Sequence, residues 1–455
     1  MIFSKTDTTN LTEGPIVKQL ILLSFPLLFS SLGMMLFNVV DIFFISKLGV
    51  QEIAALSFTF PVIMAIMSIA IGLEIGTTAL VSQAFGEGNH KKVKNLTTQS
   101  ILLSLIVVFV FTIIGVLSID KVFQLLGADI NLIPMIKDYM LIWYPGIIVL
   151  IIPMVGNSAI RATGNTAFPS KILIIAMVIN VVLDPIFIFG LFGFPKIGLK
   201  GAALATVLAR TVMLVLSMEL LYGKLDMISL NLLKLQNLLK NWQSLIYISL
   251  PAGLTNIIIP ISFGFIISLI AEKGTEAVAA YGIATRLEGF LLVVVMALGL
   301  ALAPFVGQNW GAHKYYRVKS AVKYSYRFIV LWGILIWIAL RFFSNPLISL
   351  FSNIPSIMKT ASTYYLIIAW VYGFRGVLRM STTILSIIIK PIDSSFFSIL
   401  QSLVLLIPLG YLGNYFWGLN GIFWALTFSY LISGNAAYFW LKKKIDIQIN
   451  ALPPS

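Results

Sequence analysis

Residues 81–86 of this chain read VSQAFG, and residues 306–311, which lie 225 positions further on, read VGQNWG. The same offset relates SFP at 24–26 to SLP at 249–251. A constant offset over separate motifs is not expected by chance, so it indicates a duplicated chain. Duplicated halves are common in membrane transporters, where the substrate binds between the repeats.

The composition is typical of a protein surrounded by lipid. Of the 455 residues, 59% are hydrophobic and 11% are charged, and the mean hydropathy is +0.98. A water-soluble protein of this size needs far more charged surface. Soluble functions are therefore excluded, and the net charge of +14 fits basic loops beside lipid headgroups better than nucleic-acid binding.

Twelve apolar stretches are long enough to cross a bilayer, which takes about 20 residues. Because backbone polar groups find no water in hydrocarbon, each stretch is expected to be a helix. The sequence thus predicts an all-α polytopic membrane protein with twelve transmembrane helices in two six-helix lobes. The expected spans are 19–46, 52–84, 97–118, 134–160, 171–193, 199–221, 244–270, 276–308, 325–346, 359–386, 395–415 and 419–441.

The predicted organisation has an N-terminal lobe at 1–221, a connecting segment at 222–243 and a C-terminal lobe at 244–455. The connecting segment permits either a short amphipathic helix on the membrane or a simple tether. Basic residues fall unequally on alternate loops, 19 against 8, with four arginines inside spans. This bias predicts a multi-pass plasma-membrane protein with both termini in the cytoplasm.

Several chemistries are excluded by residue type. The chain has no cysteine and two histidines, so thiolate or histidine metal sites are not expected. No phosphate-binding loop or Ser/His/Asp arrangement occurs. We therefore expect a protein that is not an enzyme and has no cofactor.

Acidic residues inside the predicted spans are the candidate functional groups. An ionised side chain at the centre of a bilayer costs at least about 2.5–3.5 kcal/mol, so it requires a reason. Asp41 lies in the first span, while Asn180 and Asp184 are four residues apart on one face of the fifth. Together they can form an oxygen-rich pocket that holds Na⁺ or shares a proton. Alternatively, Asp41 bonds only to neighbouring backbone.

The repeat supports a special role for these acids. The positions equivalent to Asp41 and Asp184 in the second half are Ile266 and the region of Ile407. Acids confined to one half suggest an ion site in the N-terminal lobe. Glu74 is a weaker candidate, flanked by Gly72 and Gly76, which allow close helix packing.

In the second half, Glu288 is the best acidic candidate for ion binding. Arg286, Arg375 and Arg379 are possible counter-charges. A structural ion pair is the favoured interpretation of Glu288, and a role in coupling is the alternative.

The chain resembles the multidrug and toxic compound extrusion (MATE) family over nearly its whole length. The motifs are LSFP at 23–26, NVVD at 38–41, VSQAFGEG at 81–88, RATGNT at 161–166, NVVLDP at 180–185 and GAALAT at 201–206. The resemblance is to the DinF-like branch, whose first-helix acid works with residues on helices four to six. It implies a cation-coupling set comprising Asp41, Tyr139, Asn157, Asn180, Asp184 and Thr206. NorM-like relatives carry an acid on the tenth helix, where this chain has Arg375 and Arg379.

The favoured hypothesis is multidrug antiport by alternating access. Small organic, often cationic or amphiphilic, xenobiotic compounds would leave the cell in exchange for incoming H⁺ or Na⁺. The transporter is expected to be a monomer. The alternative is a flippase for lipid-linked oligosaccharide or peptidoglycan precursors, whose pyrophosphate would bind the arginines inside the spans.

Overall fold

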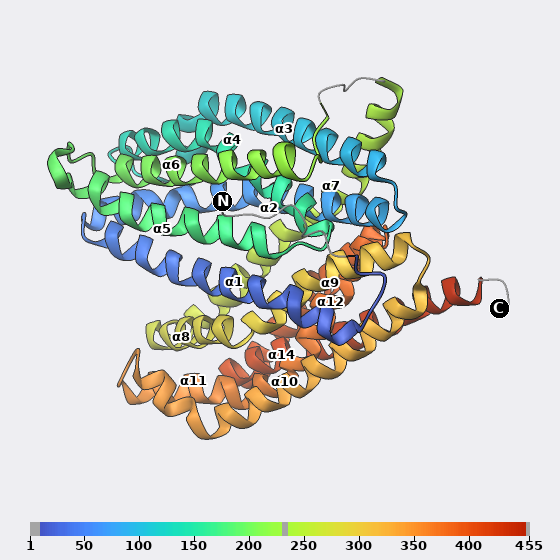
Figure 1. The fold of residues 1–455 in the computed structure, drawn as a ribbon. Coiled ribbons are helices and arrows are strands. Elements are labelled where there is room, and N and C mark those ends of the chain that lie inside the picture. Colours follow the sequence, from blue (N-terminus) through green and yellow to red (C-terminus); the bar gives the residue numbers. More distant parts are fainter. Residues whose placement is uncertain (1–9, 230–234, 452–455) are drawn as a thin grey trace. The chain divides into compact units, whose positions relative to one another are not determined.

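The computed structural model describes residues 10–229 and 235–451, and no β-strand occurs in these two ranges (Figure 1). In chain order the α-helices are α1 (Ile16–Ser46), α2 (Val50–Gly86), α3 (His90–Leu125), α4 (Ile133–Ala162), α5 (Ala167–Phe189), α6 (Leu199–Met218), α7 (Leu235–Ala271), α8 (Thr275–Leu291), α9 (Val293–Gly311), α10 (Tyr315–Ser349), α11 (Pro355–Ile368), α12 (Tyr372–Ile387), α13 (Pro391–Ile399) and α14 (Leu406–Asn450).

These helices make the twelve predicted crossings. Helices α8 and α9 together form the eighth crossing, with a break at Leu292. Helices α11 and α12 form the tenth, separated by a 3-10 turn at Ala369–Val371. Helix α14 contains the end of the eleventh crossing and all of the twelfth, which part at Gly418, where φ is 57°. By length and composition alone, ten stretches of the described residues qualify as spans, because the tenth crossing is interrupted and the last two are joined.

The predicted connecting segment, 222–243, is only partly described. A π-helical turn at Glu219–Lys224 ends the sixth crossing, and α7 already begins at Leu235. Residues 230–234 of the possible amphipathic helix lie outside the described residues. Lys5 and Lys234, two of the 19 basic residues on the predicted cytoplasmic side, also lie outside them. The proposed lobe boundaries stay a prediction.

The described chain forms two compact units. The first contains Phe25–Gly253, and the second contains Leu11–Ser24 together with the chain from Leu254 onward. Helix α1 therefore changes unit beside Pro26, and α7 changes unit close to Pro251. These prolines are the equivalent residues of the two repeat motifs SFP and SLP.

Helix α4 is at the centre of the first unit, where it packs on α2, α3 and α6, and α6 packs in turn on α5 (Figure 1). The glycines that flank Glu74 pack against α7, as predicted. A Cβ atom on Gly72 would collide with the Ser249 carbonyl oxygen, and one on Gly76 would collide with the Ser249 side chain. The two backbones can approach this closely only because both positions lack a side chain.

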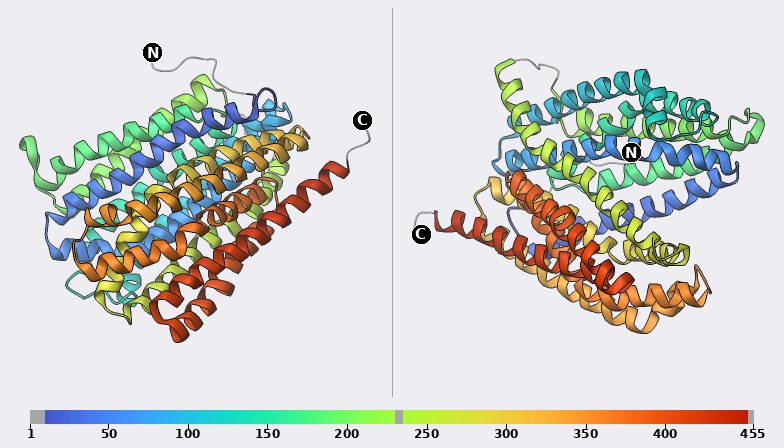
Figure 2. Two further views of the ribbon diagram at one scale, coloured as in Figure 1. Left: turned by 90° about the horizontal axis from the view of Figure 1, so that it is seen from below. Right: turned by 180° about the vertical axis from the view of Figure 1, so that it is seen from behind.

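In the second unit, α12 packs on α9, α10 and α14, while α8 packs on α11. Figure 2 shows the long α14, in red, running beside these helices. The stretch before α1 is fastened to this unit by Arg317 of α10, which donates to the carbonyl oxygens of Gly14 (2.9 Å) and Leu11 (3.1 Å). Gln308 accepts a hydrogen bond from the Leu11 backbone (3.0 Å), and Asn309 donates to the Leu11 carbonyl (3.0 Å). The repeat motif VGQNWG thus holds Leu11, in the described stretch before α1.

Candidate functional site

Four helices of the first unit supply the main candidate site. Asp41 comes from α1, Tyr139 from α4, Asn180 and Asp184 from α5, and Thr206 from α6. On α5 the four-residue spacing aligns Asn180 with Asp184. Because α6 packs against both α4 and α5, a polar residue on its inner face meets residues from both helices.

Asn180 connects the carboxylate of Asp184 to α6. Its amide satisfies all partners when the nitrogen donates to Asp184 Oδ2 (2.8 Å) and the oxygen accepts from Thr206 Oγ1 (3.2 Å) and the Thr206 backbone N–H (3.0 Å). This orientation is assigned from the hydrogen-bond network, since an amide oxygen and nitrogen have nearly the same shape. The amide fixes one oxygen of Asp184 in place.

The other oxygen of Asp184 has no such partner. Asp184 is 0% exposed, and its Oδ1 atom makes no hydrogen bond to any described residue. A buried polar atom without a partner is rare and calls for an explanation. Asp41 is half-buried and interacts electrostatically with Asp184, while the buried Tyr139 hydroxyl interacts with both carboxyl groups. Two acids and a phenol are therefore near enough to interact electrostatically, and one oxygen of Asp184 has no hydrogen-bond partner.

Asn157 lies apart from this cluster. Its side-chain oxygen accepts a hydrogen bond from Ser217 Oγ of α6 at 3.0 Å, and it is 2% exposed. Ser217 and Thr206 are eleven residues apart on α6, which corresponds to about 16 Å of helix. The Asn157–Ser217 pair thus joins α4 to α6 at another level.

A partly buried ion pair in the first unit was not foreseen from the sequence. Arg161, in the last turn of α4, pairs with Glu74 of α2. The predicted fourth span, 134–160, ends one residue before Arg161. The signal that could have identified the pair is Glu74 itself, because an acid inside a span requires a counter-charge.

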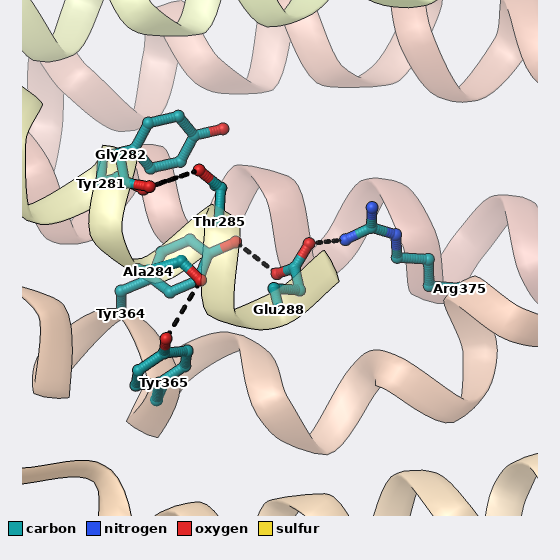
Figure 3. A network of polar contacts seen from close by, with 8 residues as sticks. All are labelled: Tyr281, Gly282, Ala284, Thr285, Glu288, Tyr364, Tyr365 and Arg375. Atoms are coloured by element: carbon teal, nitrogen blue, oxygen red, sulfur yellow. Dashed lines mark hydrogen bonds and ion pairs between the residues drawn. The ribbon is translucent and has the colours of Figure 1, made fainter. Parts of the chain in front are cut away.

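In the second unit, Glu288 of α8 is the centre of a polar network (Figure 3). It forms an ion pair with Arg375 of α12, and it accepts a hydrogen bond from the Tyr364 hydroxyl of α11 at 2.6 Å. The guanidinium of Arg375 also lies 5.2 Å from the ring centre of Tyr430. Glu288 is 4% exposed. Because Arg375 and Tyr364 contact its carboxylate, fixed groups of the protein balance its charge. This geometry favours the structural interpretation of Glu288 over a coupling role.

Buried tyrosines surround this pair, and no motif in the sequence marks them as part of a site. The rings of Tyr281 and Tyr364 meet edge to face at 5.7 Å, and Tyr365 donates to the Ala284 carbonyl at 3.0 Å. Tyrosine inside an apolar span needs a partner for its hydroxyl. The adjacent Tyr364 and Tyr365 within the tenth span were the available signal.

Twelve crossings in two related halves, with buried ionisable groups between helices, define the class of polytopic secondary transporters. The MatE family model matches residues 26–186 and again residues 251–412. The chain therefore belongs to the MatE family. The two tandem matches also confirm that the halves are repeats.

Named relatives of known sequence and structure agree with this assignment. The FAD transporter of Shewanella oneidensis is 38% identical over 433 residues, covering 95% of this chain and 96% of the relative. Multidrug export protein MepA of Staphylococcus aureus is 24% identical and covers 97% of each chain. The crystal structure of the Vibrio cholerae MATE transporter VcmN in the bent form has a TM-score of 0.89 at 30% identity, covering 95% of this chain and 98% of that one. These relatives are transporters, which confirms the prediction that the chain is a membrane transporter and not an enzyme.

Proposed function

We propose that this transporter exchanges an organic substrate for a cation that loads the Asp41–Asp184 cluster. The observation that carries the proposal is the buried Asp184 oxygen without a hydrogen-bond partner. Two carboxyl groups in a poorly solvated site repel each other when both are ionised, and binding one cation removes that repulsion. The cluster therefore favours a loaded and an unloaded form that differ by one positive charge.

The proposed coupling ion is H⁺. The Asn180 amide nitrogen donates to one oxygen of Asp184, and the Asn180 oxygen already accepts from Thr206. The buried Tyr139 hydroxyl interacts electrostatically with Asp184. Sodium needs several oxygen ligands, and this arrangement leaves it chiefly the two carboxylates. A proton needs only one free carboxylate oxygen, which Asp184 Oδ1 supplies. Sodium coupling is the other outcome of the test below.

Coupling requires that the cation and the substrate favour different conformations of the protein. In the proposed cycle, an outside proton loads the cluster and favours the conformation that releases substrate, and loss of the proton to the cytoplasm resets it. We propose alternating access in a monomer of the plasma membrane, with both termini in the cytoplasm. The excess of basic residues on one set of loops supports this orientation.

The proposed substrate is an aromatic organic compound, and the first candidate is flavin adenine dinucleotide (FAD). The FAD transporter of Shewanella oneidensis is more similar to this chain, at 38% identity, than MepA is, at 24%. Three arginines deep inside the spans form no ion pair with any described residue and also favour a substrate with phosphate groups, namely Arg210, Arg286 and Arg379. Cationic drugs are the second candidate, supported by the relatives that export drugs.

Transport into proteoliposomes tests this proposal, with the proton and sodium gradients imposed separately and with FAD or ethidium as substrate. Uptake of FAD driven by the proton gradient alone is expected. Asp184→Asn and Asp41→Asn should reduce this uptake to the background level, because an asparagine amide cannot take up the coupling proton. Asp138→Asn is the matched control, since Asp138 lies next to Tyr139 but is exposed and pairs with Lys200 at 3.1 Å. Full transport by Asp184→Asn would contradict the proposal, and transport driven only by sodium would reassign the ion.

A further inference from the structure

The second unit contains a cavity of about 730 Å³ between α10, α12 and α14. These three helices pack on one another (Figure 1). The cavity lies where α10 begins and where α14 ends, which is the predicted cytoplasmic end of both helices. It shares no residue with the Asp41–Asp184 cluster, which belongs to the first unit.

One end of the cavity is strongly basic. Lys319, Lys323 and Arg327 of α10 line it, and Lys442 of α14 lies opposite. The only acid in the lining is Asp446, which pairs with Lys319 at 2.7 Å. Among the described residues, Lys323, Arg327 and Lys442 form no ion pair, so three positive charges face the cavity without a counter-charge.

The spacing of the α10 cations makes this arrangement unfavourable for the empty protein. Residues 319, 323 and 327 follow one another at four-residue intervals, so their side chains lie in one row on the helix. Like charges at this spacing destabilise a helix. A bound anion would replace this repulsion by attraction. The row of basic side chains on α10 can hold the charged end of a ligand.

The other end of the cavity is apolar. Further along the same face of α10 the lining continues with Val330 and Leu331, and Leu331 is 66% exposed. Phe374 and Val377 of α12 lie opposite. The ligand therefore needs an anionic head and a long apolar tail. A free phosphate or a nucleotide meets only the first requirement.

The wall between the two ends is held in place by its own contacts. The Tyr326 hydroxyl shares a 2.5 Å hydrogen bond with Ser381 of α12, and its ring lies 5.4 Å from that of Tyr438 of α14. These contacts join all three helices behind the cavity. The cavity is thus formed before any ligand arrives, which reduces the entropy lost on binding.

We propose that this cavity is a binding site for an anionic phospholipid of the cytoplasmic leaflet. The phosphate lies against Lys323, Arg327 and Lys442, and an acyl chain lies along Val330 and Leu331. Basic pockets between transmembrane helices on the cytoplasmic side are the sites where anionic headgroups bind. The inference concerns lipid and does not depend on the transported substrate.

Native mass spectrometry of the full chain in mild detergent tests the site, with phosphatidylglycerol or phosphatidylcholine added. The wild type should retain phosphatidylglycerol with about tenfold preference, and Lys323→Gln/Arg327→Gln should lose that preference because it removes two charge-assisted contacts. Lys390→Gln/Lys443→Gln removes the same charge from residues outside the lining and should keep the preference. Lys323→Arg/Arg327→Lys, which keeps both charges, should keep it too.

Three results would overturn the proposal. Equal binding of both lipids by the wild type would show that no anionic site exists, and unchanged selectivity in Lys323→Gln/Arg327→Gln would show that the site lies elsewhere. Glycerol phosphate, which has the head but no tail, should not displace bound phosphatidylglycerol at equal concentration. Complete displacement would mean that the cavity recognises the phosphate alone and not a lipid.

Discussion

Single buried carboxyl groups have opposite surroundings in the two units. Glu288 lies against the guanidinium of Arg375 and the hydroxyl of Tyr364, so fixed groups of the protein balance its charge. Asp184 has no ion pair with any described residue, and one of its oxygens is unsatisfied. A mobile cation would therefore have a reason to bind beside Asp184 and little reason to bind beside Glu288.

Breaking the Glu288–Arg375 pair should affect stability more than transport. Arg375→Gln leaves the carboxylate of Glu288 buried without its counter-charge, which costs about 3 kcal/mol. Thermal unfolding in detergent should show this loss, and the double variant Glu288→Gln/Arg375→Gln should recover a large part of it. If Glu288→Gln instead abolished proton-driven transport while stability was unchanged, Glu288 would belong to the coupling machinery.

The residue pattern could predict part of this chemistry. The spacing of Asn180 and Asp184 places them on one helix face, whatever surrounds the helix. The partner of Glu288 could not be chosen among Arg286, Arg375 and Arg379, because the choice depends on how α8 packs against α11 and α12. The position of Asn157 beside Ser217 also depends on the packing of α4 against α6.

At the scale of helices, small residues set how closely α2 and α7 approach. Gly72→Ala should destabilise the protein by about 1–3 kcal/mol, because the new methyl group overpacks the contact with the Ser249 carbonyl. Folded yield and unfolding temperature in detergent measure the effect.

Gly264→Ala is the matched control for this helix contact. Gly264 also lies within α7, but no atom lies within 4 Å of the position that its Cβ would occupy. The free energy of unfolding of the Gly264→Ala variant should differ from that of the wild type by less than about 1 kcal/mol. Equal losses in the two variants would mean that glycine flexibility matters, and not the close approach of the helices.

The existence of the helices was predictable from the apolar stretches, but their interruptions were not. Only Gly418, with its positive φ of 57°, falls at a boundary that the sequence indicated, between spans ending at 415 and starting at 419. The breaks at Leu292 and at Ala369–Val371 lie inside apolar stretches and have no proline beside them. They depend on tertiary contacts, which apolar periodicity does not record.

At the scale of the whole molecule, the duplication was visible in the sequence, but the course of the N-terminal stretch was not. Leu11–Ser24 belongs to the second unit because Arg317 and the repeat motif hold backbone carbonyl groups that carry no sequence signal. The first part of α1, up to Ser24, therefore belongs to the second unit, and the rest of α1 belongs to the first.

This attachment should be measurable by hydrogen exchange. Arg317→Gln removes several charge-assisted hydrogen bonds, worth about 2 kcal/mol together, and should speed backbone exchange in residues 11–24 about 30-fold. Arg341→Gln, at the far end of α10, should leave this stretch unchanged. Unaltered exchange in Arg317→Gln would mean that other contacts hold the stretch.

The central claim is that substrate and proton compete through the Asp41–Asp184 cluster, and proton release on substrate binding tests it most directly. Purified protein in weakly buffered detergent solution at mildly acidic pH would be mixed with FAD while a pH-sensitive dye reports free protons. The wild type should release protons in proportion to the substrate bound, and Asp184→Asn should bind substrate without releasing any. Equal proton release by the wild type and Asp184→Asn would contradict the claim.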